Sequence, residues 1–155
     1  MATKMMQKTL PKTAPKPVPK TVLIPILSKR ENAPDFLIQS TESYDFVVLL
    51  SVLDRDESVG SFGFAANEIR LANHLMEQIA QFLSVQGKQV EQILEWGTVA
   101  SKISQTAGFY NCQKIVLVRQ ENEYYHKLVT DLRVLSRIEI EEVIVPVSGA
   151  SASGG

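Results

Sequence analysis

The sequence has 155 residues and 45% hydrophobic content, which is enough for one domain with a substantial core. Its formal net charge of −1 is unevenly spread: the first 20 residues carry five lysines and no acidic residue, whereas the remainder has 11 basic and 17 acidic side chains. An acidic body argues against nucleic-acid binding, because that binding depends largely on basic side chains that neutralise phosphates.

Cysteine content and hydropathy indicate the cellular setting. Cys112 is the only cysteine, so no intrachain disulfide can form and a reducing compartment is the simpler interpretation. The chain has neither an apolar run of the signal-peptide type near its start nor a stretch of 18 or more apolar residues. We therefore expect a cytoplasmic protein that is not inserted in a membrane.

Both ends of the chain have the composition of unfolded segments. Lysines recur at every fourth position from Lys4 to Lys20, together with four prolines. Because proline lacks an amide donor and like charges repel, residues 1–20 are predicted to be a disordered leader. It is interpreted as solubilising, with an arm for an anionic partner as the alternative. Residues 148–155 are predicted to be a flexible Ser/Gly tail, which leaves 21–147 as the folded domain.

Three elements are predicted at the start of this domain. The aliphatic run at residues 21–27 indicates a strand, and Asn32 is expected to cap a short helix that has Pro34 in its first turn. Residues 45–54 form a continuously apolar run rich in β-branched residues. Such a run favours a strand that is buried on both faces and central in a parallel sheet.

The longest predicted helix begins near Phe64 and ends at Gly87. An apolar stripe with three- and four-residue spacing marks its buried face: Phe64, Ile69, Ala72, Leu75, Met76, Ile79, Phe82 and Leu83. A strand is predicted at Gln89–Trp96, followed by a turn and N-cap at Gly97 and Thr98. The next helix has a buried face formed by Val99, Ala100, Ile103 and Ala107.

The last part of the domain repeats this alternation. Lys114–Val118 is predicted as the fourth strand and residues 141–147 as the fifth. Pro146 cannot donate to a ladder, so the fifth strand is expected at an edge of the sheet. Between these strands lies a helix with the stripe Tyr125, Leu128, Val129, Leu132 and Leu135.

The alternation of strands and helices predicts an α/β fold, a three-layer α/β/α doubly wound sandwich with a five-stranded parallel sheet. In such sheets ligands bind beyond the carboxyl ends of the strands where the winding reverses, here after the first and fourth strands. The candidate residues of this crevice are Pro25, Ile26, Leu27, Ser28, Lys29, Arg30, Val118, Arg119 and Gln120.

Three sequence features carry a family resemblance: the strand "VLIPI", the helix start at Gly97 and Thr98, and the segment "NCQKIVLV". With these features, residues 21–147 resemble the universal stress protein domain. The resemblance implies an adenine nucleotide alpha hydrolase-like fold, and commonly a homodimer built on the last strand. In this sequence the implied dimer residues are Val143, Ile144, Val145 and Pro146.

The departures from the family pattern concern nucleotide binding. ATP-binding members follow the fourth strand with a glycine-rich motif whose amides hold the phosphates. The matching residues 119–136 contain no glycine and include Glu121 and Glu123, which would repel a polyphosphate. These acidic residues suit a helix N-terminus instead, in preference to an acidic catalytic pair. Members also carry an Asp after the first strand, where this sequence has Leu27.

The hypothesis that follows is a non-enzymatic regulatory or interaction domain, homodimeric and with an unidentified protein partner. Its nucleotide site is degenerate but still admits an uncharged or adenosine-sized ligand, and no cofactor is expected. One alternative is an ATP- or AMP-binding stress protein, with weak ATPase activity, that uses Ser28, Lys29 and Arg30 as phosphate contacts near Arg119. A second alternative is a cytosolic regulatory domain that partners a membrane transporter.

Other chemically capable side chains are interpreted as structural. Tyr124, Tyr125 and His126 form a cluster that favours packing over adenine stacking. His74 falls on the polar side of its helix, and two lone histidines predict no metal site. Cys112 is expected to be a small buried residue rather than a nucleophile, and Trp96 a packing residue.

Overall fold

The computed structural model describes residues 19–53 and 68–146. Residues 1–18 of the predicted leader, the tail and the beginning of the long helix at Phe64 therefore lie outside the described residues.

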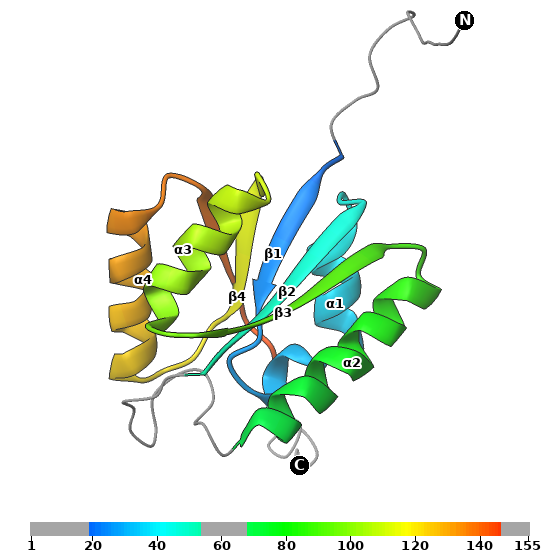
Figure 1. The fold of residues 1–155 in the computed structure, drawn as a ribbon, viewed down its shortest axis with the longest axis horizontal. Helices are drawn as coiled ribbons and strands as arrows, with labels where there is room; N and C mark the ends of the chain where they lie inside the picture. Colours follow the sequence, from blue (N-terminus) through cyan, green and yellow to red (C-terminus); the bar gives the residue numbers. More distant parts are fainter. Residues whose placement is uncertain (1–18, 54–67, 147–155) are drawn as a thin grey trace, which may run out of the picture.

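The described residues form a parallel sheet with helices on both faces (Figure 1). Its five strands have the order β3-β2-β1-β4-β5, and every neighbouring pair is parallel. The strands are β1 Thr21–Pro25, β2 Phe46–Leu53, β3 Gln89–Trp96, β4 Lys114–Val118 and β5 Glu139–Val143. The winding reverses between β1 and β4, as the element order predicts, which confirms the doubly wound α/β fold.

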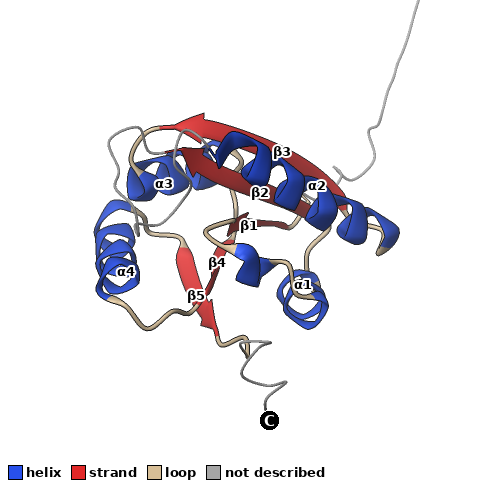
Figure 2. Ribbon diagram, turned by 90° about the horizontal axis from the view of Figure 1, so that it is seen from below, coloured by secondary structure: helices blue, strands red, loops and turns tan. Residues whose placement is uncertain are grey.

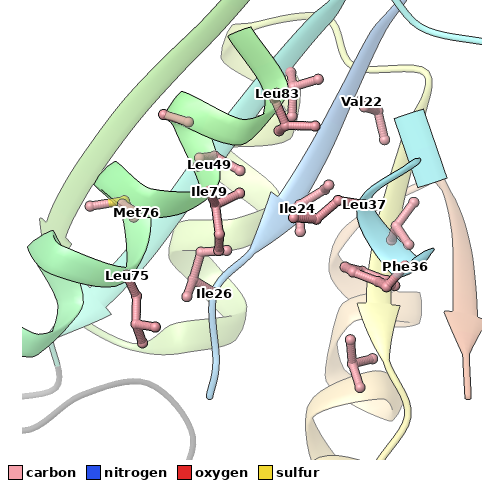
Figure 3. Close-up of a cluster of buried hydrophobic side chains, with 14 of the residues drawn as sticks. Val22, Ile24, Ile26, Phe36, Leu37, Leu49, Leu75, Met76, Ile79 and Leu83 are labelled. Carbon is pink, nitrogen blue, oxygen red and sulfur yellow. The ribbon is translucent and has the colours of Figure 1, made fainter. Parts of the chain in front are cut away.

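Helices α1 (Pro34–Thr41) and α2 (Ile69–Val85) cover one face, and α3 (Val99–Phe109) and α4 (Glu123–Leu135) cover the other (Figure 2). A short 3-10 helix, η1 (Lys29–Glu31), connects β1 to α1. Each face has its own apolar core, because successive strand residues point to opposite sides of the sheet. Figure 3 shows the core under α1 and α2, in which Ile24, Leu49 and Ile79 are fully buried.

The run at residues 45–54 is internal, as predicted. Val47 and Leu49 of β2 pack under α1 and α2, whereas Val48 and Leu50 pack under α3 and α4, and all four are essentially inaccessible. Burial on both faces explains why this strand shows no polar alternation. The central strand is β1, however, with β2 beside it.

The segment after β1 differs in detail from its prediction. The strand ends at Pro25, although the Ile26 amide still donates to the Leu50 carbonyl at 2.8 Å. Asn32 does not cap α1: that position belongs to Ala33, with Pro34 in the first turn as expected. Asn32 instead follows η1, and its Nδ2 donates to Gln78 Oε1 at 3.2 Å. The prediction failed because it did not anticipate η1.

Strand β5 is an edge strand, as Pro146 predicts, but it begins and ends earlier than residues 141–147. Just beyond the end of β4, the Arg119 amide donates to the Val143 carbonyl at 2.8 Å. Of the four residues implied for a dimer strand, only Val143 lies in β5. Ile144, Val145 and Pro146 follow the strand, which corrects the expected boundary.

Two glycine-marked element ends agree with the sequence. Gly87 has φ +87° directly after α2, a conformation in which a residue with a side chain is strained. Thr98 occupies the N-cap position of α3, but its side chain makes no capping hydrogen bond. Within the described ranges, 19–53 and 68–146, no helix is long and apolar enough to cross a membrane.

Candidate functional site

The sheet topology brings the two predicted site segments together. Leu23 of β1 is in register with Ile115 of β4, and the same offset places Ile26 level with Val118. Residues 25–30 and 118–120 therefore meet at the carboxyl edge of the sheet, and we call this region the carboxyl-edge site. This juxtaposition is the one predicted from the order of strands and helices.

On the β1 side, the apolar members of the site belong to the core. Ile26 is fully buried and Leu27 is 6% exposed, so both side chains pack inward. Lys29 and Arg30 are exposed. Ser28 is half-buried, and its Oγ accepts a hydrogen bond from the Arg30 amide at 3.1 Å. Ser28 is therefore already used as the cap of η1.

Glu31 is a buried carboxyl that the sequence interpretation missed. Its Oε1 accepts hydrogen bonds from the Ser28 amide (2.9 Å) and the Ser28 hydroxyl (3.1 Å). Its Oε2 is buried and has no hydrogen-bond partner. Burial raises the pKa of Glu31 to about 7, although the hydrogen bonds from Ser28 favour the charged form. The signal was present, because Ser-x-x-Glu is the pattern of a capping box.

On the β4 side, Arg119 is already compensated by acidic neighbours. Its Nε donates to Glu121 Oε2 at 3.0 Å, and its Nη1 lies 4.0 Å from Glu142 Oε1. Glu142 also accepts a hydrogen bond from the Tyr125 hydroxyl at 2.8 Å and another from Arg133 Nη2 at 3.3 Å. The guanidinium of Arg119 is therefore part of an ion-pair network.

Gln120 carries an open donor at the same edge. The side chain is 9% exposed, and its Oε1 accepts a hydrogen bond from Asn122 Nδ2 at 3.3 Å. Its Nε2 is buried and has no hydrogen-bond partner. A buried donor without a partner is uncommon, because burying a donor whose hydrogen bond is not made costs free energy.

The N-terminus of α4 is capped by the protein itself. Asn122 Oδ1 accepts a hydrogen bond from the Tyr125 amide at 2.8 Å, and Glu123 lies in the first turn. The expectation that acidic residues suit this helix start agrees with the structure for Glu123. The capping role of Asn122 was missed, although Asn is among the preferred N-cap residues.

The remaining candidates are either buried in the core or exposed on a helix surface. Tyr125 is fully buried on the core stripe, as predicted, while Tyr124 and His126 are exposed. Cys112 is buried, which raises the pKa of its thiol to about 12 and disfavours the nucleophilic thiolate. His74 is exposed on α2. In the described part of the chain, no group of three or more potential ligand side chains is arranged to hold a metal ion.

The fold defines a doubly wound parallel α/β protein whose winding reverses between β1 and β4, where the candidate site lies. No protein-family model and no curated protein matches the sequence. Comparison with solved structures places the chain in the fold of universal stress proteins.

Three of these structures illustrate the match. A universal stress protein family structure from Burkholderia pseudomallei has a TM-score of 0.59 at 15% identity, covering 83% of this chain and 98% of the other. The Archaeoglobus fulgidus protein in complex with dAMP scores 0.60 at 11% identity, covering 81% and 98%. An Arabidopsis thaliana protein with AMP bound scores 0.58 at 14% identity, covering 84% and 94%. At these identities the similarity establishes a shared fold.

Proposed function

We propose that the chain is a non-enzymatic regulatory domain of the universal stress protein type, whose carboxyl-edge site binds an uncharged, adenosine-sized ligand. The solved structures with dAMP and AMP support a ligand of the adenine class, because they share the fold. The observation that carries the proposal is the Asn122 cap on the Tyr125 amide. It occupies a donor that a phosphate would otherwise use at the start of α4.

The charges around this helix start also disfavour a triphosphate. Arg119 is held by Glu121 at 3.0 Å, and Glu123 adds a second carboxylate to the same turn. A polyphosphate would have to displace Glu121 from Arg119 and then lie beside that carboxylate. Coulomb repulsion between these anions makes the exchange unfavourable.

Two buried polar atoms suit an uncharged ligand instead. Gln120 Nε2 offers a donor beyond β4, and Glu31 Oε2 lies beyond β1. An adenine ring presents ring-nitrogen acceptors and an amino donor, and a ribose presents hydroxyl groups of both kinds. A nucleoside could therefore satisfy one or both atoms without bringing a negative charge into the site.

Calorimetric titration with adenosine, AMP and ATP tests this proposal. We expect affinity to fall in that order, and we expect Gln120→Leu to weaken adenosine binding by about tenfold, because one hydrogen bond is worth about 1.4 kcal/mol. Gln81→Leu on the exposed face of α2 is the matched control and should bind as the wild type does. ATP binding tighter than adenosine binding would contradict the proposal, as would measurable ATP hydrolysis.

The alternative is an ATP-binding protein that uses the cations beyond β1. The observation in its favour is that Lys29 and Arg30 are both exposed at the carboxyl edge. Under this alternative, Lys29→Ala combined with Arg30→Ala abolishes ATP binding. Under our proposal, the same double variant leaves adenosine affinity unchanged, so a single set of titrations separates the two.

A further inference from the structure

An open groove lies between β3 and α3, away from the carboxyl-edge site. It has a volume of about 350 Å³. Two residues of β3 and five from α3 and its C-cap line it: Ile93, Glu95, Lys102, Gln105, Thr106, Phe109 and Tyr110. We call this region the α3 groove. None of its residues belongs to the carboxyl-edge site, so the ligand proposed for that site does not account for the groove.

Two aromatic rings form one end of the α3 groove. The rings of Phe109 and Tyr110 meet edge to face, with centroids 5.0 Å apart. Phe109 is 79% exposed, and the half-buried Ile93 adds an apolar wall opposite α3. An exposed aromatic side chain beside an apolar groove wall is typical of a surface that binds another molecule.

The charges along the groove favour a cationic occupant. Glu91 lies on the same face of β3 as Ile93, because alternate residues of a strand share a face. Partial burial and the nearby charge of Glu91 raise the pKa of the Tyr110 hydroxyl. No cation among the described residues lies within ion-pair distance of Glu91, whereas Glu95 pairs with Lys102 at 3.7 Å. Two carboxylates and one ammonium group leave this face with a net negative charge.

The Lys/Pro-rich leader joins the described part of the chain beside these aromatic rings. The Lys20 carbonyl accepts a hydrogen bond from the Phe46 amide at 3.1 Å. The Phe46 ring in turn contacts the Tyr110 ring, with centroids 6.1 Å apart. Strand β1 begins at the end of the sheet where α3 ends (Figure 1). The leader is therefore attached close to the aromatic end of the α3 groove.

The sequence of the leader matches the groove in charge, in apolar pattern and in length. The leader contains lysines and no acidic residue. In the polyproline II conformation three residues complete a turn, so Pro11, Ala14 and Pro17 share one side of the segment. At a rise of about 3.1 Å per residue, residues 11–17 span about 19 Å. The helical stretch 102–110 measures about 12 Å, so the segment is long enough to follow the groove.

We propose that residues 11–17 of the chain's own leader bind in the α3 groove as a polyproline II segment. The apolar side of the segment packs on Phe109 and Tyr110, and Lys16 lies near Glu91. Proline-rich segments bind aromatic-lined grooves in this way, because their backbone loses little freedom on binding. Such docking does not depend on which ligand the carboxyl-edge site binds.

The docked leader is in equilibrium with a free leader, because its contacts lie at the surface and are individually weak. With the two forms about equally populated, docking raises the folding equilibrium constant by a factor of about two. This factor is too small to change the melting temperature by more than about 2 °C. A direct measurement of contact is therefore needed.

Carbodiimide cross-linking of the full wild-type chain tests the proposal, because this reagent joins a carboxylate to an amine in contact with it. We expect an amide bond between Lys16 and Glu91, and a weaker product between Lys12 and Glu95, both within one chain of 17.2 kDa. Mass spectrometry of tryptic peptides identifies the joined residues. If the leader lysines were instead joined to acidic residues of other faces, such as Glu139 of β5, the proposal would be wrong.

Two leader variants test which side of the segment faces the groove, and neither changes a described residue. Ala14→Asp places a carboxylate between Pro11 and Pro17, against the aromatic rings, where it is poorly solvated. Thr13→Asp adds the same charge on another side of the segment and is the matched control. We expect Ala14→Asp to give about threefold less cross-linked product than Thr13→Asp. Equal yields from the two variants would contradict the proposal.

Two surface variants test the groove in the same way. Phe109→Ser removes the exposed ring, and Val134→Ser on α4, where the side chain is 82% exposed, is the matched control outside the groove. The yield should fall about threefold with Phe109→Ser, because docking loses an aromatic contact, and should stay unchanged with Val134→Ser. Circular dichroism should remain as in the wild type for both. An equal loss in both variants would overturn the proposal. A cross-link found only in a product of twice the chain mass would also overturn it, because the groove would then hold the leader of a second copy.

Discussion

Glu31 is a fully buried carboxyl group whose hydrogen bonds reach only one of its two oxygens. Its pKa of about 7 lies above the value of 4.5 expected in the unfolded chain. Folding therefore takes up a proton between these two values. The contribution of Glu31 to the free energy of unfolding is complete below pH 4.5 and is lost as the pH rises through 7.

The variant Glu31→Gln should remove this pH dependence. Glutamine keeps an acceptor for Ser28 but cannot ionise, so the variant should gain on the order of 3 kcal/mol relative to wild type between pH 4.5 and pH 8. Urea unfolding of both proteins at several pH values measures the difference. Glu77→Gln on the exposed face of α2 is the control, and it should not reproduce the gain. A constant difference between Glu31→Gln and wild type would contradict the assignment.

The positions of individual site residues could be predicted only where the local sequence pattern determines them. Arg119 and Gln120 could be placed at the site because they follow a strand at the switch point. The ion pairing of Arg119 with Glu142 and the lack of a partner for Gln120 Nε2 could not be predicted, since both depend on packing between distant segments. Glu31 is an intermediate case: its capping box could be predicted from the sequence pattern, but its complete burial could not.

At the scale of elements, two glycines have opposite roles. Gly87 has a positive φ at the end of α2, whereas Gly108 lies inside α3, where an added Cβ would meet no atom within 4 Å. Gly87→Ala should lower the free energy of unfolding by about 1 kcal/mol, because alanine is strained at that φ. Gly108→Ala should raise it by about 0.5–1 kcal/mol, because alanine is the better helix former.

Chemical denaturation of the two glycine variants beside wild type checks both signs. The pair is its own control, since each variant adds the same methyl group. If both variants changed the free energy of unfolding in the same direction and by the same amount, the positive φ of Gly87 would not be the cause of the effect of Gly87→Ala.

The elements were predictable to the degree that hydrophobic pattern determined them. Strands β3 and β4 match their predicted limits, because turns and composition changes bound them. The end of β1 and the limits of β5 were wrong by two or more residues. The end of β1 depends on where η1 begins, and the limits of β5 depend on which residues of β4 pair with it. Hydrophobic periodicity predicts neither.

At the scale of the whole molecule, the hydrogen bonds of the sheet begin at Lys20. Its carbonyl accepts from the Asp45 and Phe46 amides, and the Thr21 amide donates to Gln113 Oε1. Deletion of residues 1–18 retains all of these bonds. We therefore expect the truncated protein to keep its melting temperature within about 2 °C of wild type.

Calorimetry of two truncations tests this domain boundary. Removing residues 1–21 should lower the melting temperature clearly, because the Lys20 and Thr21 contacts are lost. A large loss of stability already on removal of residues 1–18 would show that the Lys/Pro-rich segment contributes to the folded domain.

The position of β1 also determines when its two neighbouring strands become available during synthesis. It is synthesised first, yet it lies in the middle of the sheet, with β2 on one flank and β4 on the other. The flank that receives β4 has no partner strand until residues 114–118 emerge. Strands β1 to β3 therefore leave the ribosome before β4 and β5, so the pairing partners on the two flanks of β1 become available one after the other.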